Sequence, residues 1–507
     1  MSTFIGADLG TSGCKAALFD ESGVELARAF RPYPTQYPLP GFHEQRLQDW
    51  WNGFVGAVHD LLEQVPNRIA EVAGLALSGQ SLALIPLDDE KQPLKETVPI
   101  WSDTRAKDQS ARFFEAIDEN EWYLRTGNGF PAPLYTLFKM IWLRENEPDI
   151  FAATRTIIGS KDWINLQLTG HIATDPSYAS GSGAYDLEGH YAPDLLDTAG
   201  INPEWLPTIY PSTHIVGELT TSAARDLGLP PGIAVVNGGV DNSCMALGAQ
   251  NTRPGRVYAS LGSSSWLTVC DSRPILDFAL RPFVFAHVIP SLFNSAVSTF
   301  SSGTAVTWAM SSVFSSLGGD VDALVRIGLQ APVGAEGAVF IPTIGGGTVF
   351  EGGPQMRGGF LGLTAGSEPR HLARSVLESI PLALRLPLDR LRGITDVSDR
   401  MIVTGGGARN SDWLQIYADV LNCTLVKTNV EQQAATLGAA ALVAVGLGIW
   451  PTFDLADTAH EVLGEYSPEP RAVRHYSDHV APRFERASSA AKSMLASTKD
   501  DVHSPLG

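Results

Sequence analysis

Two stretches of the chain, about half its length apart, follow one pattern and constrain the fold most strongly. A short apolar run leads into the turn Gly10-Thr11-Ser12-Gly13, and a similar run leads into Gly262-Ser263-Ser264. A second apolar run follows each turn, so each stretch predicts two strands joined by small, hydroxylated residues. Glycine lets the backbone approach a ligand, and backbone N–H groups with hydroxyls bind phosphate oxygens. The sequence therefore predicts a duplicated domain that holds one polyphosphate from both sides.

Only the first of these turns is flanked by opposite charges, Asp8 before it and Lys15 after it. An aspartate that ends a buried strand beside such a turn indicates a metal-linked phosphate site, although turn aspartates are also common without one. Lys15 either supplies a positive charge near the terminal phosphates or is a solvated side chain on the returning strand. The two halves are therefore not expected to be equivalent.

The size and charge of the chain limit its fold and its partners. Its 507 residues are too many for one hydrophobic core and predict two or three domains. The net charge of −19 argues against nucleic acid as a partner, whereas a nucleotide needs only a few local donors and a metal ion. Four widely spaced cysteines without a Cys-x-x-Cys pair favour a reducing compartment, the cytoplasm, and no signal peptide is expected.

The alternation of apolar runs with helical patterns predicts an α/β architecture. Strands expected at 72–77, 233–236 and 401–404 all end in glycine-rich or polar turns, so the chemistry is expected at the carboxyl ends of the strands. We place the boundary between the halves just before the second hairpin. The expected divisions are residues 1–250, residues 251–460, and a tail with a last helix at 461–507.

One segment has the uncharged character of a membrane span. Residues 432–453 contain no charged side chain, but alanine and glycine dominate them and Pro451 falls near the end. A span needs about twenty strongly apolar residues. We therefore expect an ordinary buried helix here, and no membrane partner.

The turn from Asn237 to Asn242, which contains Gly238 and Gly239, carries the residue of greatest chemical interest, Asp241. A carboxylate at the end of a buried strand can accept a proton from an attacking hydroxyl, and Asn242 offers a donor and an acceptor to a polyol. Asp241 also fits the N-cap of a helix expected from about residue 243, and the two roles are compatible.

Other polar and glycine-rich clusters carry weaker signals. The run 405–410 is similar to a nucleotide-contacting turn, but a lone glycine run is weak evidence. Residues 80–81, 101–105 and 161–162 could line a sugar pocket, whereas each alone is more often a surface or capping cluster. The chain contains no Gly-Lys-Ser/Thr triplet, which excludes a P-loop as the phosphate site.

From about Thr3 to Trp450 the chain resembles the FGGY family of carbohydrate kinases, within the larger actin-like ATPase fold. The resemblance rests on four motifs, at residues 8–12, 136–146, 239–242 and 358–378. It implies two ribonuclease-H-like domains with a cleft between them, ATP and Mg²⁺ as cofactors, and a sugar as the second substrate. The assembly state is left open, a homodimer included.

The resemblance also implies roles for individual residues. Asp241 is the general base, and Asp8 helps to hold Mg²⁺. The positions where the family touches ATP are Thr11, Ser12, Lys15, Gly262, Ser263, Gly303, Thr307, Gly406 and Asn410. The positions near the sugar are Gln80, Ser81, Leu82, Trp101, Asp103, Asp241 and Asn242.

Within the family the chain is most similar to the xylulose kinases, through residues 101–105, 161–162 and 173–175. The expected reaction is therefore ATP-dependent phosphorylation of D-xylulose to D-xylulose 5-phosphate. Leu82 stands where xylulose kinases usually carry histidine, and residues 345–350 lack the usual charge pair. The alternatives are a kinase for another ketose or polyol, such as ribulose or a glycerol-like substrate, a non-catalytic sugar or nucleotide sensor, and an actin- or chaperone-like ATPase acting on protein.

Overall fold

The first predicted hairpin forms two antiparallel strands, β1 (Thr3–Leu9) and β2 (Gly13–Asp20). This is seen in a computed structural model of the chain, which describes residues 2–300, 302–430 and 433–497. Every residue of β1 is buried, because strands pair with it on both sides and helices cover both faces of the sheet. The other strands of this sheet are β3 (Glu25–Pro32), β5 (Val72–Gly79), β9 (Ile215–Glu218) and β10 (Ala234–Val240), and the order is β3-β2-β1-β5-β10-β9.

The second predicted hairpin forms β11 (Val257–Leu261) and β12 (Ser265–Asp271), at the centre of a seven-stranded sheet. Its order is β13 (Phe283–Ala286), β14 (Phe293–Thr299), β12, β11, β17 (Arg400–Thr404), β18 (Thr424–Thr428) and β19 (Val462–Tyr466). Five strands of each sheet share one arrangement, in which the first three are antiparallel and the last two run parallel to the hairpin's first strand. The predicted pair of ribonuclease-H-like domains is confirmed.

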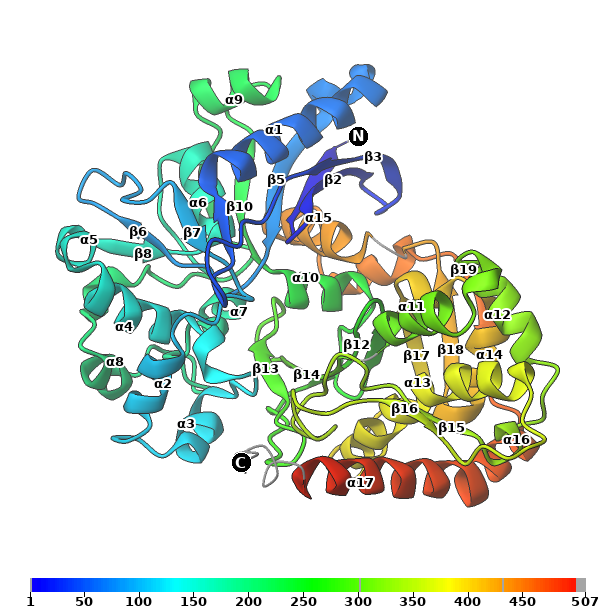
Figure 1. Ribbon diagram of the computed structural model, residues 1–507. Helices are drawn as coiled ribbons and strands as arrows, with labels where there is room; N and C mark the ends of the chain where they lie inside the picture. The colour runs from blue at the N-terminus through cyan, green and yellow to red at the C-terminus, as the bar shows by residue number, and fades with distance from the viewer. Residues whose placement is uncertain (1, 301, 431–432, 498–507) are drawn as a thin grey trace.

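Amphipathic helices cover the outer faces of the two sheets (Figure 1). Helix α1 (Leu47–Gln64) turns Trp50, Phe54, Val58 and Leu61 toward β2 and β3, as the helical spacing of these residues predicts. The other covering helices are α6 (Ser160–Thr169) and α9 (Thr221–Leu227) in the first domain, and α11 (Gly303–Ser312), α12 (Val321–Gly328), α13 (Pro369–Arg392) and α14 (Ser411–Leu421) in the second.

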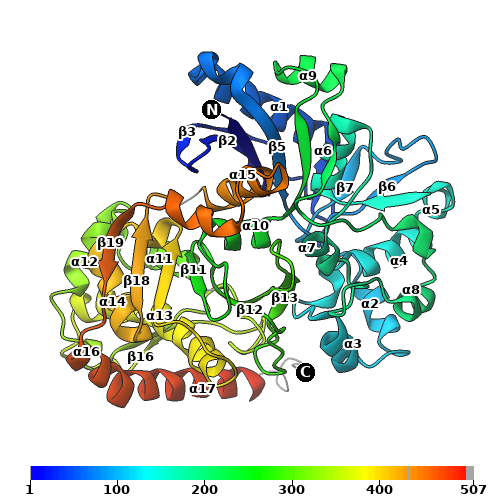
Figure 2. The ribbon, with the colours of Figure 1, turned by 180° about the vertical axis from the view of Figure 1, so that it is seen from behind.

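Helices α10 (Asp241–Gly248) and α15 (Ala434–Gly446) lie against each other between the two sheets, as both views show (Figures 1 and 2). Glycine allows this approach, because a Cβ on Gly438 would lie 2.0 Å from the carbonyl oxygen of Cys244. The predicted buried helix is thus α15, and no helix within the described ranges has the length and apolar character needed to cross a bilayer. Residue 432, at the start of the uncharged segment predicted to be a buried helix, lies outside the described residues, as does residue 301.

A separate layer of short helices lies below the first sheet in Figure 1 and has its own core, which includes Trp122, Tyr135 and Phe138. Phe283 and Phe285 of β13 belong to the same core, so this layer packs against the edge of the second sheet. Its helices are α2 (Lys107–Phe113), α3 (Glu119–Thr126), α4 (Thr136–Asn146), α5 (Pro148–Ala153), α7 (Pro176–Ala179) and α8 (Pro193–Ala199).

The remaining elements are short strand pairs and the C-terminal helices. The pairs are β4 (Glu44–Arg46) with β7 (Thr97–Pro99), β6 (Ile85–Leu87) with β8 (Thr156–Ile158), and β15 (Val339–Ile341) with β16 (Gly359–Leu361). Helix α16 (Pro470–His475) precedes α17 (Ala481–Ser497), which runs along the second domain (Figure 1).

Candidate active site

Three parallel strands of the first sheet end side by side. Leu9 of β1 pairs with Gly79 of β5, and Gly79 pairs with Val240 of β10. The residues that follow these strand ends, among them Gln80 and Asp241, therefore meet at one edge of the sheet. One position earlier along the strands, the Ser78 hydroxyl donates a 2.8 Å hydrogen bond to Asp8.

The charge of Asp8 influences the ionisation of Asp241 at this edge. Burial raises the pKa of Asp241 to about 7, with a further contribution from the charge of Asp8 and an opposing one from the N–H of Asn242. Burial also raises the pKa of Asp8, against the charge of Lys15 and the hydrogen bond from Ser78. A carboxylate with a pKa near neutrality is suited to taking up and releasing a proton. Asp241 opens α10, two residues earlier than the sequence predicts.

A buried lysine joins the segments predicted to line the sugar site. Lys139 of α4 is fully buried, and its Nζ donates to the carbonyl oxygens of Leu82 (2.9 Å) and Ile100 (2.7 Å). These carbonyls adjoin Ser81 and Trp101 in the sequence. Burial lowers the pKa of Lys139 to about 7, partly offset by the charge of Asp103. The lysine thus joins two loops that are also linked by a backbone hydrogen bond from the Leu84 N–H to the Pro99 carbonyl oxygen.

A buried glutamine links the turn after β1 to the segments predicted to line the sugar site. Gln45 donates from Nε2 to the carbonyl oxygen of Thr11, and its Oε1 accepts from Trp50 and from Gln80 Nε2. The indole of Trp101 donates to the Thr11 hydroxyl at 2.8 Å. Thr11, Gln80 and Trp101 therefore belong to one hydrogen-bonded group.

Asp103, two residues after Trp101, fixes its loop through hydrogen bonds to its carboxylate. Its carboxylate is fully buried and accepts hydrogen bonds from the backbone of His43 and from the backbone and guanidinium of Arg105. Both oxygens are occupied by these bonds, so the contact we predicted between Asp103 and a sugar would require them to rearrange. Ser81 is buried and Asn242 half-buried, each directly after a residue at the strand edge.

A pocket of about 770 Å³ lies in the second domain, where β11 and β17 end. Of the nine residues predicted to contact ATP, the six from the second half of the chain line it, namely Gly262, Ser263, Gly303, Thr307, Gly406 and Asn410. The other three, Thr11, Ser12 and Lys15, lie on the hairpin of the first domain.

Close backbone contacts shape this pocket. The N–H of Gly303 donates to the carbonyl oxygen of Gly262 at 3.0 Å, and a Cβ on Gly303 would lie only 2.6 Å from that oxygen. On the opposite wall, Asn410 caps α14 by accepting from the N–H of Trp413 and donates to Asp322 of α12 at 2.6 Å. The Asn410 amide therefore joins two helices across the pocket.

Comparison with known proteins agrees with this geometry. The N-terminal domain of the FGGY family of carbohydrate kinases matches residues 3–248, and the C-terminal domain matches residues 257–447. The chain belongs to this family. It is a carbohydrate kinase, as the motifs predict, and a sugar and ATP are the substrates that its family implies.

Several relatives cover nearly the whole of this FGGY kinase. A xylulose kinase of Lactococcus lactis is 29% identical over 94% of each chain, and a gluconokinase of Bacillus subtilis is 26% identical over 91% of this chain and 90% of its own length. The crystal structure of a xylulose kinase from Rhodospirillum rubrum is 28% identical, superposes with a TM-score of 0.90, and covers 97% of this chain and all of its own.

Sequence reasoning did not single out several residues of this candidate site. Lys139 was recognised only as part of a family motif, although a lysine within an apolar helical stretch is a signal of buried hydrogen bonding. Asp322 and Trp413 line the pocket of the second domain, and neither stands in a motif. Gln45 gives no local signal, because its partners are distant in the sequence.

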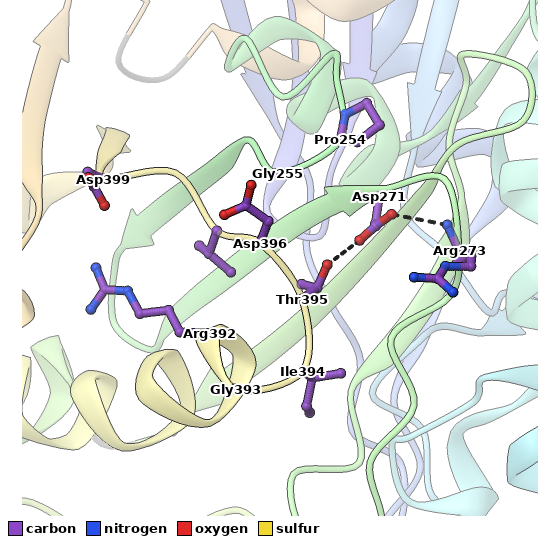
Figure 3. A pocket seen from close by; sticks show the side chains of 11 residues that line it. Pro254, Gly255, Asp271, Arg273, Arg392, Gly393, Ile394, Thr395, Asp396 and Asp399 are labelled. Atoms are coloured by element: carbon purple, nitrogen blue, oxygen red, sulfur yellow. Dashed lines mark hydrogen bonds between the residues drawn. The ribbon is translucent and has the colours of Figure 1, made fainter.

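A second pocket, of about 670 Å³, lies where β11 and β17 of the kinase begin, at the other end of the sheet from the pocket of about 770 Å³ (Figure 3). Its lining includes Asp271, Arg273, Asp396 and Asp399, and Asp271 accepts hydrogen bonds from the Thr395 hydroxyl and the Arg273 N–H. None of the predicted site residues lines it.

Proposed function

We propose that this kinase transfers the γ-phosphoryl group of ATP to D-xylulose and forms D-xylulose 5-phosphate. The observation that carries the proposed chemistry is Asp241, a carboxylate with a pKa near 7 at the strand edge shared with Asp8 and Gln80. The choice of D-xylulose is supported by the xylulose kinases that align with almost the whole chain.

In the proposed reaction Asp241 accepts the proton of the sugar's primary hydroxyl as that oxygen attacks the γ-phosphorus. The new O–P bond forms while the bond to the departing ADP oxygen breaks, and no covalent enzyme intermediate is needed. The proposed sugar contacts are Gln80, Ser81, Leu82, Trp101 and Asn242, with Asp103 anchoring the loop of Trp101. Most of the rate then depends on alignment and on neutralising charge.

We further propose that Asp8 holds a divalent cation, Mg²⁺. Two carboxylates at one strand edge, where the charge of Asp8 raises the pKa of Asp241, form an oxygen-rich and electrostatically unfavourable pair that suits such an ion. When bound, the cation would neutralise phosphate charge. Thr11, Ser12 and Lys15 on the first hairpin and Gly262 and Ser263 on the second are the proposed phosphate contacts, and Gly303, Thr307, Gly406 and Asn410 complete the nucleotide site.

We also make proposals about the domain boundaries, the cellular location and the oligomeric state. We propose the division into residues 1–250, 251–460 and 461–507, in which β19 of the last part pairs with β18 of the second. A cytoplasmic location is supported by the four cysteines, which are all free and buried. A homodimer stays a prediction, and light scattering after size-exclusion chromatography tests it.

Sugar-dependent ADP formation tests the function. We expect D-xylulose to give the highest kcat/KM in a panel with D-ribulose, glycerol and gluconate, the last suggested by the gluconokinase relative. A tenfold preference for another acceptor would overturn the substrate assignment. Nucleotide binding without sugar-dependent turnover in the whole panel would favour the sensor alternative.

The Asp241→Ala variant tests the mechanism separately. We expect it to lose sugar phosphorylation by several orders of magnitude while it still binds ATP, because the nucleotide pocket lies in the other domain. A variant that keeps substantial activity in a coupled ADP assay would contradict the role of Asp241 as general base.

A further inference from the structure

A fully buried charged cluster lies beneath the turn that carries Asp241, and the reaction proposed above makes no use of it. Lys161 and Asp162 lie in the first turn of α6, and Asp175 caps the short helix α7. All three side chains are at most 1% exposed, and Lys161 Nζ lies 2.6 Å from Asp162 and 3.2 Å from Asp175. Buried charges are retained only where they are paired, so this cluster has a defined geometry.

A chain of hydrogen bonds leads from the cluster to the catalytic turn. The second carboxylate oxygen of Asp175 accepts from the hydroxyls of Ser177 (2.5 Å) and Ser212 (2.8 Å). The Ser177 hydroxyl in turn accepts a 2.9 Å hydrogen bond from the backbone N–H of Val240, the residue before Asp241. Hydrogen bonds connected in this way strengthen one another in a low-dielectric interior.

Strand pairing alone does not fix the turn. The register between β10 and β5 shifts between Val236 and Gly239, so the ladder is interrupted at Asn237 and Gly238 before it resumes at Gly239 and Val240. Gly238 has a φ of +78°, and a Cβ there would lie 2.0 Å from the carbonyl oxygen of Leu77. Side chains replace the missing ladder bonds, since Lys161 and Asn165 both donate to the carbonyl oxygen of Asn237.

We propose that Ser177 is a positioning residue for the general base, and that Asp175 and Lys161 orient its hydroxyl. With the hydroxyl's proton donated to Asp175, a lone pair faces Val240, and this contact sets where Asp241 stands at the strand edge. The inference rests on the proposed role of Asp241. A 1 Å displacement of a reacting group can reduce a rate by about 10²-fold, which makes such a contact consequential.

Two serine variants distinguish an effect on the position of Asp241 from an effect on the stability of the buried cluster. Ser177→Ala and Ser212→Ala each remove one buried hydroxyl that donates to Asp175, but only Ser177 also bonds the backbone next to Asp241. We expect Ser177→Ala to lower kcat by about 10- to 100-fold, with the KM for sugar and the dissociation constants of both substrates changed less than about threefold. Ser212→Ala should keep kcat within about threefold, and the two variants should lower the melting temperature by about the same amount.

The outcomes decide between the explanations. Equal losses of kcat in the two variants, or an unchanged kcat in Ser177→Ala, would overturn the positioning role. Should Ser177→Ala not fold, Ser177→Cys keeps the volume with a weaker acceptor, and full activity there counts against the proposal. An active Asp241→Asn enzyme would instead refute the general base, whatever the serine variants show.

Discussion

Replacing Asp241 by asparagine should abolish phosphoryl transfer and yet stabilise the fold. Asparagine keeps the shape of the side chain and an oxygen that can accept from the N–H of Asn242, but it cannot ionise. Burial and the charge of Asp8 raise the pKa of Asp241 from an ordinary 3.8 to about 7. A shift of this size corresponds to about 4 kcal/mol, since one pKa unit is worth about 1.4 kcal/mol.

The pH dependence follows from the direction of that shift. The unfolded chain releases the proton of Asp241 near pH 4, whereas the folded chain holds it to about pH 7. The wild-type protein therefore loses this stability as the pH rises from about 4 to 7, and the loss persists at higher pH. The asparagine variant does not lose it, so its advantage should be absent near pH 4 and largest above pH 7.

Scanning calorimetry without ligands measures this difference. For a unit of about 250 residues, about 4 kcal/mol corresponds to a melting temperature about 8 °C higher for the variant at pH 8. The matched control is Asp89→Asn, which removes an exposed turn carboxylate and should show no such pH-dependent gain. An Asp241→Asn protein that melts at or below the wild-type temperature at pH 8 would refute the electrostatic reasoning.

Three further predictions concern the rest of the site. The logarithm of kcat/KM should rise with pH and level off above about 7 as Asp241 ionises, and a pH–rate profile that is flat from 5.5 to 8 would contradict this. Gly303→Ala should raise the KM for ATP at least tenfold, because the new methyl group meets the Gly262 carbonyl at 2.6 Å, while sugar binding measured by calorimetry stays unchanged. Lys139→Met should raise the KM for sugar about tenfold and leave ATP binding intact, because it releases the carbonyls of Leu82 and Ile100; an equal effect on both substrates would indicate general unfolding.

The sequence predicted those parts of the fold that depend on local pattern. Both hairpins, the strands ending at Gly79 and Val240, and the buried helix α15 have local signals, namely apolar runs that end in glycine or polar turns. The shared strand order of the two sheets could be expected only through duplication and family resemblance. The register that aligns Leu9, Gly79 and Val240 depends on packing between distant segments, and no local pattern specifies it.

The candidate site also has parts that the sequence predicted and parts that depend on partners distant in the chain. The family resemblance implied the six residues that line the pocket of the second domain, and Gly262, Ser263 and Gly406 also stand in glycine- or hydroxyl-rich turns beside predicted strands. The contacts of Asp103 were not predictable, since an aspartate in a polar run gives no indication that Arg105 and the His43 backbone occupy its oxygens. Supporting residues such as Gln45 act through partners far away in the chain.

Two fully buried lysines, Lys139 and Lys161, donate hydrogen bonds to irregular backbone next to the candidate site. Lys139 donates to the carbonyl of Leu82, a non-glycine residue with a φ of +62°, and Lys161 donates to the carbonyl of Asn237, where the strand ladder is interrupted. Both carbonyls lie in backbone too irregular to be satisfied by a neighbouring strand, and an unpaired buried carbonyl costs about 1–3 kcal/mol. An ammonium group on a long side chain can reach such carbonyls from a separate helix. Irregular backbone lets Ser81 and Asp241 stand at the strand edge, and the buried lysines make that backbone stable.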